Sequence, residues 1–414
     1  MVPVTGPTTT SATLDPPART RALHFRLAVL ALAVGGFAIG TTEFVTMGVL
    51  PQIADGVDVS IPVAGRIISS YALGVVIGAP LLAYFGARLP RQQLLIGLMA
   101  AYALFNALSA LAPNYETLMV ARFLDGLPHG GYFGVASLVA ASMVAPERRG
   151  RAIALVLMGL PVANVVGVPA ATWLGQTLGW RASYWVVAGL AALTIALVLG
   201  FVPDCPGNPE ATGRRELQAL RKPQVWFAIV AGAIGFGGMF AMYSYIAPMA
   251  THVGGLPNAA VPVFLLTLGV GMVFGNWVAG LTVDWSLKKS LLLSPVALAV
   301  TLLVSWVLMP LGFAALPALF LITTTGSVLA LGLMIRLIDV AGHAETLGAA
   351  LSHGSLNIGN ALGAWFGGVT IAVGYGYRSP LVVGAGLSLA GFAVLAVAFS
   401  LDGTPADHSE AVTS

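Results

Sequence analysis

The sequence has few charged residues and a single cysteine, and each shortage excludes a class of protein. Asp, Glu, Lys and Arg make up 8% of the 414 residues, whereas a typical soluble domain carries about 25%. The lone Cys205 excludes an internal disulfide and a cysteine-based metal framework. The sequence also lacks a phosphate-binding loop with its lysine, a catalytic triad and a metal-ligand cluster, so neither an ATP-driven pump nor an enzyme is supported, and no cofactor or metal is expected.

Apolar residues replace the missing charges. They make up 57% of the chain, and the mean hydropathy is +0.90, which indicates a polytopic membrane protein. The 50 glycines and 25 prolines are compatible with membrane helices, because small residues let helices approach and neighbours satisfy the freed backbone groups. The formal charge of +3 does not indicate a nucleic-acid partner, since the basic residues lie in short loops.

The apolar pattern predicts an all-α protein of twelve membrane-spanning helices arranged in two six-helix halves. A polar interruption at 204–222 separates an N-terminal bundle at 25–203 from a C-terminal bundle at 223–401, and solvated tails are expected at 1–24 and 402–414. Within the linker, 214–222 is either a short amphipathic helix or plain chain. The predicted spans are 25–50, 62–87, 92–112, 115–143, 150–176, 181–203, 224–250, 258–284, 288–311, 314–338, 346–373 and 379–401.

The distribution of basic residues predicts that both termini are cytoplasmic. With the N-terminus inside, three arginines fall in outer loops: Arg66, Arg181 and Arg378. The inner side then carries Arg19, Arg21, Arg26, Arg88, Arg91, Arg148, Arg149, Arg151, Arg214, Arg215, Arg221, Lys222, Lys288, Lys289 and Arg336. This asymmetry follows the positive-inside rule.

Internal repeats support the division into halves. Residues 76–95 align without a gap to residues 273–292, so that Gly78 matches Gly275 and Arg91 matches Lys288. Small residues spaced four apart recur on the second helix of each three-helix unit, as nested inverted repeats would predict. These stripes are Gly74 and Gly78; Gly159, Ala163, Gly167, Ala171 and Gly175; Gly271, Gly275 and Ala279; and Gly359, Gly363 and Gly367.

Several stretches resemble the major facilitator superfamily, and within it the twelve-span drug/proton antiporters. The resemblance to bacterial arabinose/sugar efflux permeases and chloramphenicol exporters lies in GTTEFVTMGVLPQIA (40–54), GAPLLAYFGARLPRQ (78–92), ARFLDGLPHGGYFG (121–134), YSYIAP (243–248) and NIGNALGAWFGG (357–368). It extends from about residue 26 to 401 and implies export by alternating access, without specifying a substrate.

The resemblance also implies gating residues in two cytoplasmic loops. The family's signature between helices 2 and 3, G-x-x-x-D-R-x-G-R-[RK], keeps its basic positions at Arg88 and Arg91 but has Ala87 where the acid stands. The related copy between helices 8 and 9 keeps the acid, Asp284, and carries Lys288. Loss of the first acid weakens the transfer of the family's gating role.

Glu43 is a carboxylate inside the first apolar span, where burial is costly and usually serves a function. At a rise of ~1.5 Å per residue, Glu43 and Arg122 of the fourth span lie at comparable heights in the outer half. Arg122, Asp125 and His129 share one helix face, and Arg122 matches the family's helix-4 arginine. We expect Glu43 to exchange a proton and Arg122 to sense its charge.

Each of these residues has a structural alternative. Glu43 could be held by the neighbouring threonine hydroxyls or the backbone, and Arg122 could pair with Asp125 one turn along. His129 either relays protons or is a neutral core residue. Substrate contacts are predicted for polar or aromatic side chains in apolar spans: Asn164, Tyr243, Tyr245, Asn276, Asn357, Asn360 and Trp365. Hydrogen bonding between helices is the alternative for these residues.

These observations together predict a monomeric, multi-pass transporter of a bacterial cytoplasmic membrane that exchanges protons for a small uncharged or amphipathic molecule such as a sugar or a drug. Its expected partners are that substrate, protons and lipid. A proton-independent facilitator or uptake porter is one alternative. A non-transporting membrane sensor or scaffold is another, although no soluble signalling domain accompanies the spans.

Overall fold

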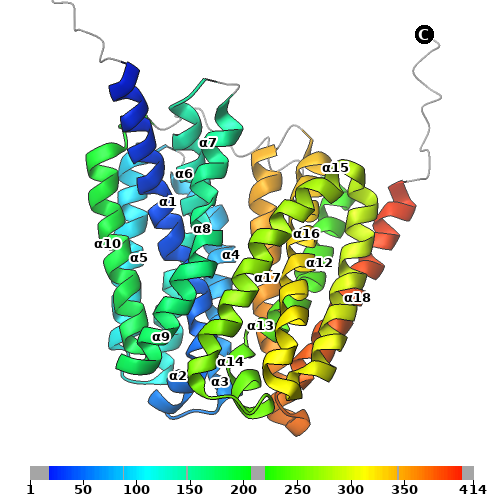
Figure 1. Cartoon of the computed structure of the whole chain (residues 1–414). Coiled ribbons are helices and arrows are strands. Elements are labelled where there is room, and N and C mark those ends of the chain that lie inside the picture. Colours follow the sequence, from blue (N-terminus) through cyan, green and yellow to red (C-terminus); the bar gives the residue numbers. More distant parts are fainter. Residues whose placement is uncertain (1–17, 87, 146–147, 207–219, 343–344, 403–414) are drawn as a thin grey trace, which may run out of the picture.

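The computed structural model describes residues 18–86, 88–145, 148–206, 220–342 and 345–402. All regular structure in these ranges is helical, and the long helices run roughly parallel (Figure 1). The beginning of α1 and the end of α18 lie at the same end of the bundle, which we call the terminal face. The other end is the opposite face.

The first half of the chain forms six crossings. They are built from α1 (Ala18–Gly48), α2 (Leu50–Gly56), α3 (Ile61–Ala64), α4 (Arg66–Gly86), α5 (Arg91–Leu111), α6 (Tyr115–Ser142), α7 (Arg149–Leu157), α8 (Gly159–Val162), the π-helix η2 (Ala163–Gly167), α9 (Val168–Leu178) and α10 (Arg181–Phe201). The fifth crossing is the one interrupted by η2, between two prolines of the same crossing. These prolines are Pro161 and Pro169, and the helix between them contains a π-helical turn.

The second half forms the other six. They are built from α12 (Pro223–Gly235), α13 (Gly237–Tyr243), α14 (Ile246–Pro248), η4 (Met249–Val253), η5 (Asn258–Ala260), α15 (Val261–Leu308), η6 (Met309–Ala315), α16 (Leu316–Ala341), α17 (Glu345–Thr370), η7 (Ile371–Tyr375) and α18 (Ser379–Asp402). The non-helical Ser286 divides α15 into two crossings.

The twelve-crossing prediction is confirmed. In the described ranges nine helical stretches are long and apolar enough to span a membrane. One of them, Asn258–Ala341, contains three crossings, and α6 adds another whose polar residues lower its hydropathy. α1 begins at Ala18, earlier than the predicted residue 25, because the preceding Ala, Arg and Leu favour helix even where the chain is no longer apolar. Residues 1–17, 207–219 and 403–414, and with them most of the predicted tails and linker, lie outside the described residues.

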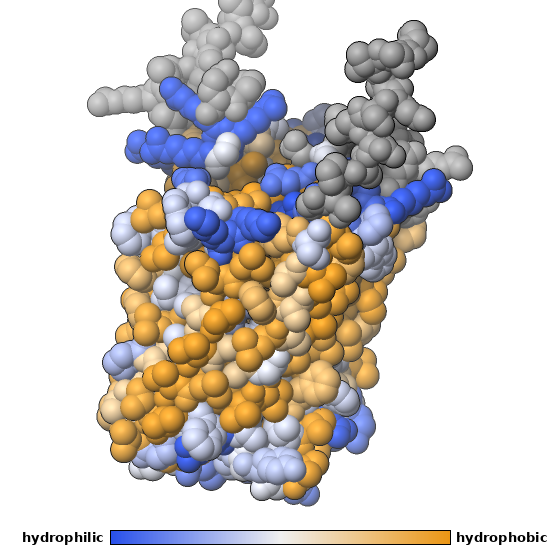
Figure 2. All heavy atoms as spheres, turned by 90° about the vertical axis from the view of Figure 1, so that its right-hand side faces the viewer, coloured by the Kyte–Doolittle hydropathy of each residue, from blue (hydrophilic) through white to orange (hydrophobic). Residues whose placement is uncertain are grey.

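An apolar belt surrounds the bundle between two polar ends. Figure 2 shows it on the side formed by α15, α16 and α18, with hydrophilic residues gathered at the terminal face. Large apolar side chains such as Val300, Leu303 and Val307 are exposed there, as a lipid-facing surface requires.

The glycine stripes lie where helices pack most closely. A Cβ on Gly78 of α4 would lie 2.2 Å from the Leu127 carbonyl of α6, and one on Gly275 of α15 would lie 2.7 Å from the Thr324 carbonyl of α16. The aligned glycines of the two repeats thus serve equivalent second-to-fourth helix contacts, which confirms the expectation that the stripes are packing surfaces.

The two halves meet along α17 and α4, toward the opposite face. The Ser69 hydroxyl of α4 donates a 2.9 Å hydrogen bond to the Ala361 carbonyl of α17. Nearer the opposite face, Tyr245 is buried against α3 and α17, so that a Cβ on Gly65 would lie 2.2 Å from its hydroxyl. Nearer the terminal face, the ring of Phe133 stacks on His353 with centroids 6.4 Å apart, and His353 is exposed.

Candidate functional site

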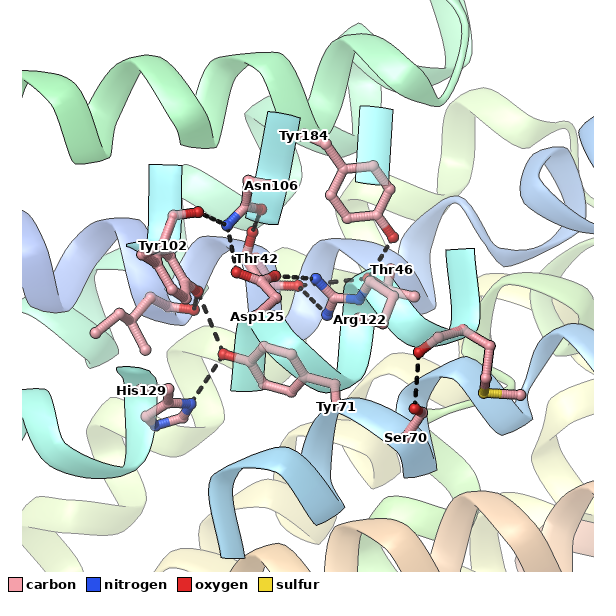
Figure 3. Close-up of polar contacts among 12 residues, drawn as sticks. Thr42, Thr46, Ser70, Tyr71, Tyr102, Asn106, Arg122, Asp125, His129 and Tyr184 are labelled. Atoms are coloured by element: carbon pink, nitrogen blue, oxygen red, sulfur yellow. Dashed lines mark hydrogen bonds and ion pairs between the residues drawn. The ribbon is translucent and has the colours of Figure 1, made fainter. Parts of the chain in front are cut away.

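Four buried side chains from three helices close a hydrogen-bonded ring in the first half (Figure 3). Arg122 Nη1 of α6 lies 2.5 Å from Asp125 Oδ2. Asn106 of α5 donates to Asp125 Oδ1 at 2.6 Å and accepts from the Thr42 hydroxyl of α1 at 2.6 Å. Arg122 Nη2 closes the ring with a long 3.5 Å hydrogen bond to the Thr42 carbonyl. This carbonyl belongs to the peptide group that precedes Glu43.

Aromatic rings enclose the guanidinium. Arg122 Cζ lies 4.3 Å from the ring centroid of Tyr71 and 5.2 Å from that of Tyr184, distances at which a cation is attracted to the ring faces. The Tyr71 hydroxyl continues the polar cluster, because it lies 3.2 Å from the Tyr102 hydroxyl and 2.9 Å from His129 Nδ1. His129 is therefore joined to the cluster through Tyr71.

Glu43 lies where the two halves meet. It is buried, and Asn360 Nδ2 of α17 donates a 3.4 Å hydrogen bond to its Oε1. In the described part of the chain Glu43 forms no ion pair, because Arg122 pairs with Asp125 instead. Arg122 therefore makes the structural pair with Asp125 that was considered as an alternative. Glu43 is a buried carboxylate, and its polar partner, Asn360, belongs to the other half.

Aromatic residues line the same level of the molecule. Phe44 lies 5.0 Å from Tyr243 and 6.0 Å from Phe240 of α13, measured between ring centroids. The Tyr243 hydroxyl donates a 3.3 Å hydrogen bond to Asn164 Oδ1 in η2. Asn164 is buried and contacts the other half through this hydrogen bond. With Glu43 and Tyr243 it forms part of a mixed polar and aromatic surface between the halves.

The remaining predicted substrate residues are not all at this surface. The Tyr245 hydroxyl donates to the Ala364 carbonyl at 2.7 Å, so Tyr245 belongs to the closed contact near the opposite face. Asn276 is exposed. It lies two turns beyond Gly269 on the same face of α15, and Gly269 packs on the Asn164 backbone. Trp365 is half-exposed and its ring contacts Phe366 of its own helix. Asn357 is buried on α17 and donates to the His353 carbonyl.

The four predicted gating residues lie near the terminal face. Arg88, Asp284 and Lys288 are exposed and Arg91 is partly buried. The Arg91 backbone N–H donates to the Cys205 carbonyl at 2.8 Å, and Lys288 Nζ lies 5.5 Å from the Phe399 ring. Among the described residues no ion pair joins these four side chains.

Five members of the site were not predicted from the sequence: Asn106, Tyr71, Tyr102, Tyr184, and Thr46, whose hydroxyl lies 2.9 Å from the Tyr184 hydroxyl. Asn106 was identifiable in principle, as an amide inside the apolar span 92–112. The tyrosines had no such signal, because an aromatic residue in a membrane helix is usually a packing residue. Tyr71 and Tyr184 contact Arg122, and Tyr102 contacts Tyr71, through helix packing alone.

Comparison with known proteins agrees with this architecture. Residues 32–353 match the family model described as Major Facilitator Superfamily. The chain is 41% identical to the inner membrane transport protein YdhP of Escherichia coli (strain K12) over 90% of this chain and 95% of that protein. It is 34% identical to a chloramphenicol resistance protein of Streptomyces lividans, over 84% of this chain and 90% of that protein. The D-xylose-proton symporter structure superposes with a TM-score of 0.70 at 16% identity, covering 90% of this chain and 97% of that one.

Proposed function

Since the chain belongs to the major facilitator superfamily and is a multi-pass membrane transport protein, we propose that it is a proton-coupled exporter of a small uncharged or amphipathic molecule. The observation that carries the proposal is the position of Glu43, a buried carboxylate with no ion-pair partner among the described residues and one hydrogen bond to the other half. Such a group in a membrane interior is costly and is typical of a proton or substrate site.

The direction of transport rests on topology and on relatives. The described basic residues gather at the terminal face, which favours a cytoplasmic location for both termini. The hydrogen bond from Ser69 to the Ala361 carbonyl joins the halves toward the opposite face, so we assign this conformation as closed on the side opposite the termini. Relatives named for chloramphenicol resistance and sugar efflux favour export over uptake, and YdhP favours a bacterial inner membrane.

In the proposed cycle the two halves rock about the Glu43 level. In the outward-open state Glu43 takes up a proton from outside, and the substrate leaves. In the inward-open state Glu43 releases the proton to the cytoplasm, and the charged carboxylate is available to substrate. Exchange requires only that proton and substrate each disfavour binding of the other, which is a coupling free energy between two ligands. The Arg122–Asp125 pair supplies a fixed charge pattern beside Glu43, through the Thr42 carbonyl.

The proposal is tested with Glu43→Gln in everted vesicles with an imposed pH gradient. Radiolabelled chloramphenicol and arabinose are the first probes, after a growth screen in an exporter-depleted host. We expect gradient-driven transport to be lost, while Glu116→Gln, at an exposed glutamate in the first turn of α6, leaves it unchanged. Full gradient-driven transport by Glu43→Gln would refute the coupling role. If the transport rate of the unmodified protein does not depend on the pH gradient, a proton-independent facilitator is favoured.

A further inference from the structure

Two asparagines on α17 have amide groups whose orientation is set by their surroundings. Asn357 Nδ2 donates to the His353 carbonyl at 3.0 Å, and Asn360 Nδ2 donates to Glu43 Oε1 at 3.4 Å. A backbone carbonyl and an ionised carboxylate accept hydrogen bonds and cannot donate them. Turning the Asn357 amide over would place two acceptors against each other, and the same holds for Asn360 while Glu43 is ionised. In that state the carbonyl oxygen of each residue points away from its partner.

Both carbonyl oxygens are buried and lack a hydrogen-bond partner among the described residues. A buried acceptor left unpaired is unfavourable, which makes a pair of them on one helix an observation that requires an explanation. Residues three apart lie on the same side of a helix, and this side of α17 faces the first half, because Asn360 reaches Glu43. Glu43, Asn357 and Asn360 therefore form a group of acceptors between the halves.

Free donors are scarce beside these acceptors. The Tyr243 hydroxyl is directed to Asn164. The guanidinium of Arg122 has an unpaired Nε, but it lies between the rings of Tyr71 and Tyr184 and pairs with Asp125. The protein thus presents unmatched acceptors next to an apolar aromatic wall formed by Phe44, Phe240 and Tyr243.

We propose that the transported molecule is a neutral compound with at least two neighbouring hydrogen-bond donors, hydroxyl or amide N–H groups, which pair with Asn357 Oδ1, Asn360 Oδ1 and the Glu43 carboxylate. Its apolar part packs on the aromatic wall. Carboxylates and phosphates are rejected, because they bring acceptors to acceptors. The inference rests on the proposed export function and specifies its substrate class by donor number.

The same geometry gives a reason for exchange. When Glu43 takes up a proton, one of the acceptors that holds the substrate becomes a donor. A substrate hydroxyl paired with Glu43 then loses its charged acceptor and keeps only the weaker neutral carbonyl oxygen, while the new Glu43 O–H competes with the substrate for Asn360 Oδ1. Proton and substrate therefore compete at a single carboxylate, without any need for a second coupling site.

The test measures binding to the purified full-length protein in detergent, with no gradient, by equilibrium dialysis of radiolabelled probes. The donor-bearing probes are chloramphenicol and arabinose, each compared with its O-methylated derivative, and tetraphenylphosphonium serves as a donor-free amphiphile. We expect O-methylation to weaken binding roughly tenfold for each donor removed.

The role of Asn357 as an acceptor for the substrate is tested by measuring the binding of each probe to variants of this residue. In Asn357→Leu the preference for the parent over its O-methylated derivative should fall by about tenfold, whereas Asn357→Gln, which retains both the amide donor and the carbonyl acceptor, should keep it. Asn258→Leu, at an exposed asparagine before α15, is the control. If Asn357→Leu fails to fold, as judged by gel filtration, Asn357→Ala takes its place, with the same expected fall in the parent-to-derivative ratio.

Equal binding of parent and O-methylated probes would overturn the inference, as would failure of both donor-bearing probes to bind. Because this readout needs no pH gradient, it is separable from the vesicle test. Donor-dependent binding together with gradient-insensitive transport would retain the substrate class and remove proton coupling. The reverse result would retain coupling and remove the substrate class.

Discussion

The Thr42 hydroxyl donates a 2.6 Å hydrogen bond to Asn106 Oδ1, which ties α1 to α5 one residue before Glu43. The Asn106 amide donates to Asp125, and Arg122, which pairs with Asp125, donates to the Thr42 carbonyl. All four side chains are buried. A buried hydrogen-bonded ring restricts how its helices can be arranged, so the position of Glu43 depends on residues that do not contact it.

Replacing Asn106 with Leu removes the central link of this ring. Asp125 then loses its Asn106 hydrogen bond and the Thr42 hydroxyl loses its acceptor, and each unsatisfied buried group costs about 1–3 kcal/mol. We expect a lower thermal unfolding temperature in detergent and slower gradient-driven export. The decisive measurement is the pH dependence of export. It should change if the ring positions Glu43, whereas general destabilisation would lower the rate equally at every pH. Asn258→Leu should change neither property.

Removing one partner of the Arg122–Asp125 pair should be more harmful than removing both. Asp125→Asn leaves a buried guanidinium without its carboxylate, and Arg122→Gln leaves a buried carboxylate without its cation, each at a cost of about 3–5 kcal/mol. The double variant should recover part of the loss in a thermal unfolding cycle. The exposed pair Arg336–Asp402 is the comparison, and breaking it should cost at most about 1 kcal/mol. Additive losses in the Arg122–Asp125 cycle would contradict a direct interaction.

Two glycines of α6 should respond oppositely to alanine. A Cβ on Gly126 would lie 2.1 Å from the Tyr71 carbonyl of α4, whereas nothing lies within 4 Å of a Cβ on Gly134. Gly126→Ala must separate α4 from α6, move Tyr71 away from Arg122 and destabilise the protein by about 1–3 kcal/mol. Gly134→Ala should be neutral or slightly stabilising, because alanine favours helix by up to about 1 kcal/mol. Equal unfolding temperatures for the two variants would show that the helices tolerate separation.

A cross-link between Ser69 and Ala361 should stop transport. These residues join α4 to α17 across the halves, and alternating access requires that contact to open. In a Cys205→Ser background, the double variant Ser69→Cys/Ala361→Cys is treated with a short reagent that carries two thiol-reactive groups. It should lose at least about nine-tenths of its export, with each single cysteine as control. A reagent with a reducible spacer should allow export to return on reduction. Undiminished export by a fully cross-linked sample would mean that this contact does not open during transport.

Much of the fold followed from the sequence because the bilayer imposes a simple rule. Every crossing must be a helix of about 20 apolar residues, so the number of spans and their approximate bounds can be counted directly. The close contacts of Gly78 and Gly275 were also predictable, since small residues let helices approach each other.

The site was predicted less completely, and particular residues explain why. Glu43, Arg122 and Asp125 were identifiable individually, because charge in an apolar span is rare. Tyr71 and Tyr184 were not, because their role depends on which rings face the guanidinium. Tyr245 resembled a substrate residue in sequence, yet it packs where the halves close.

The sequence by itself determined that the chain is a membrane-embedded bundle of twelve helices with a buried acid in the first, because hydropathy and charge act residue by residue. Only the tertiary structure decided that Arg122 binds Asp125 and that Glu43 meets Asn360. Those choices depend on the rotation and height of helices far apart in the chain, and side-chain packing sets both.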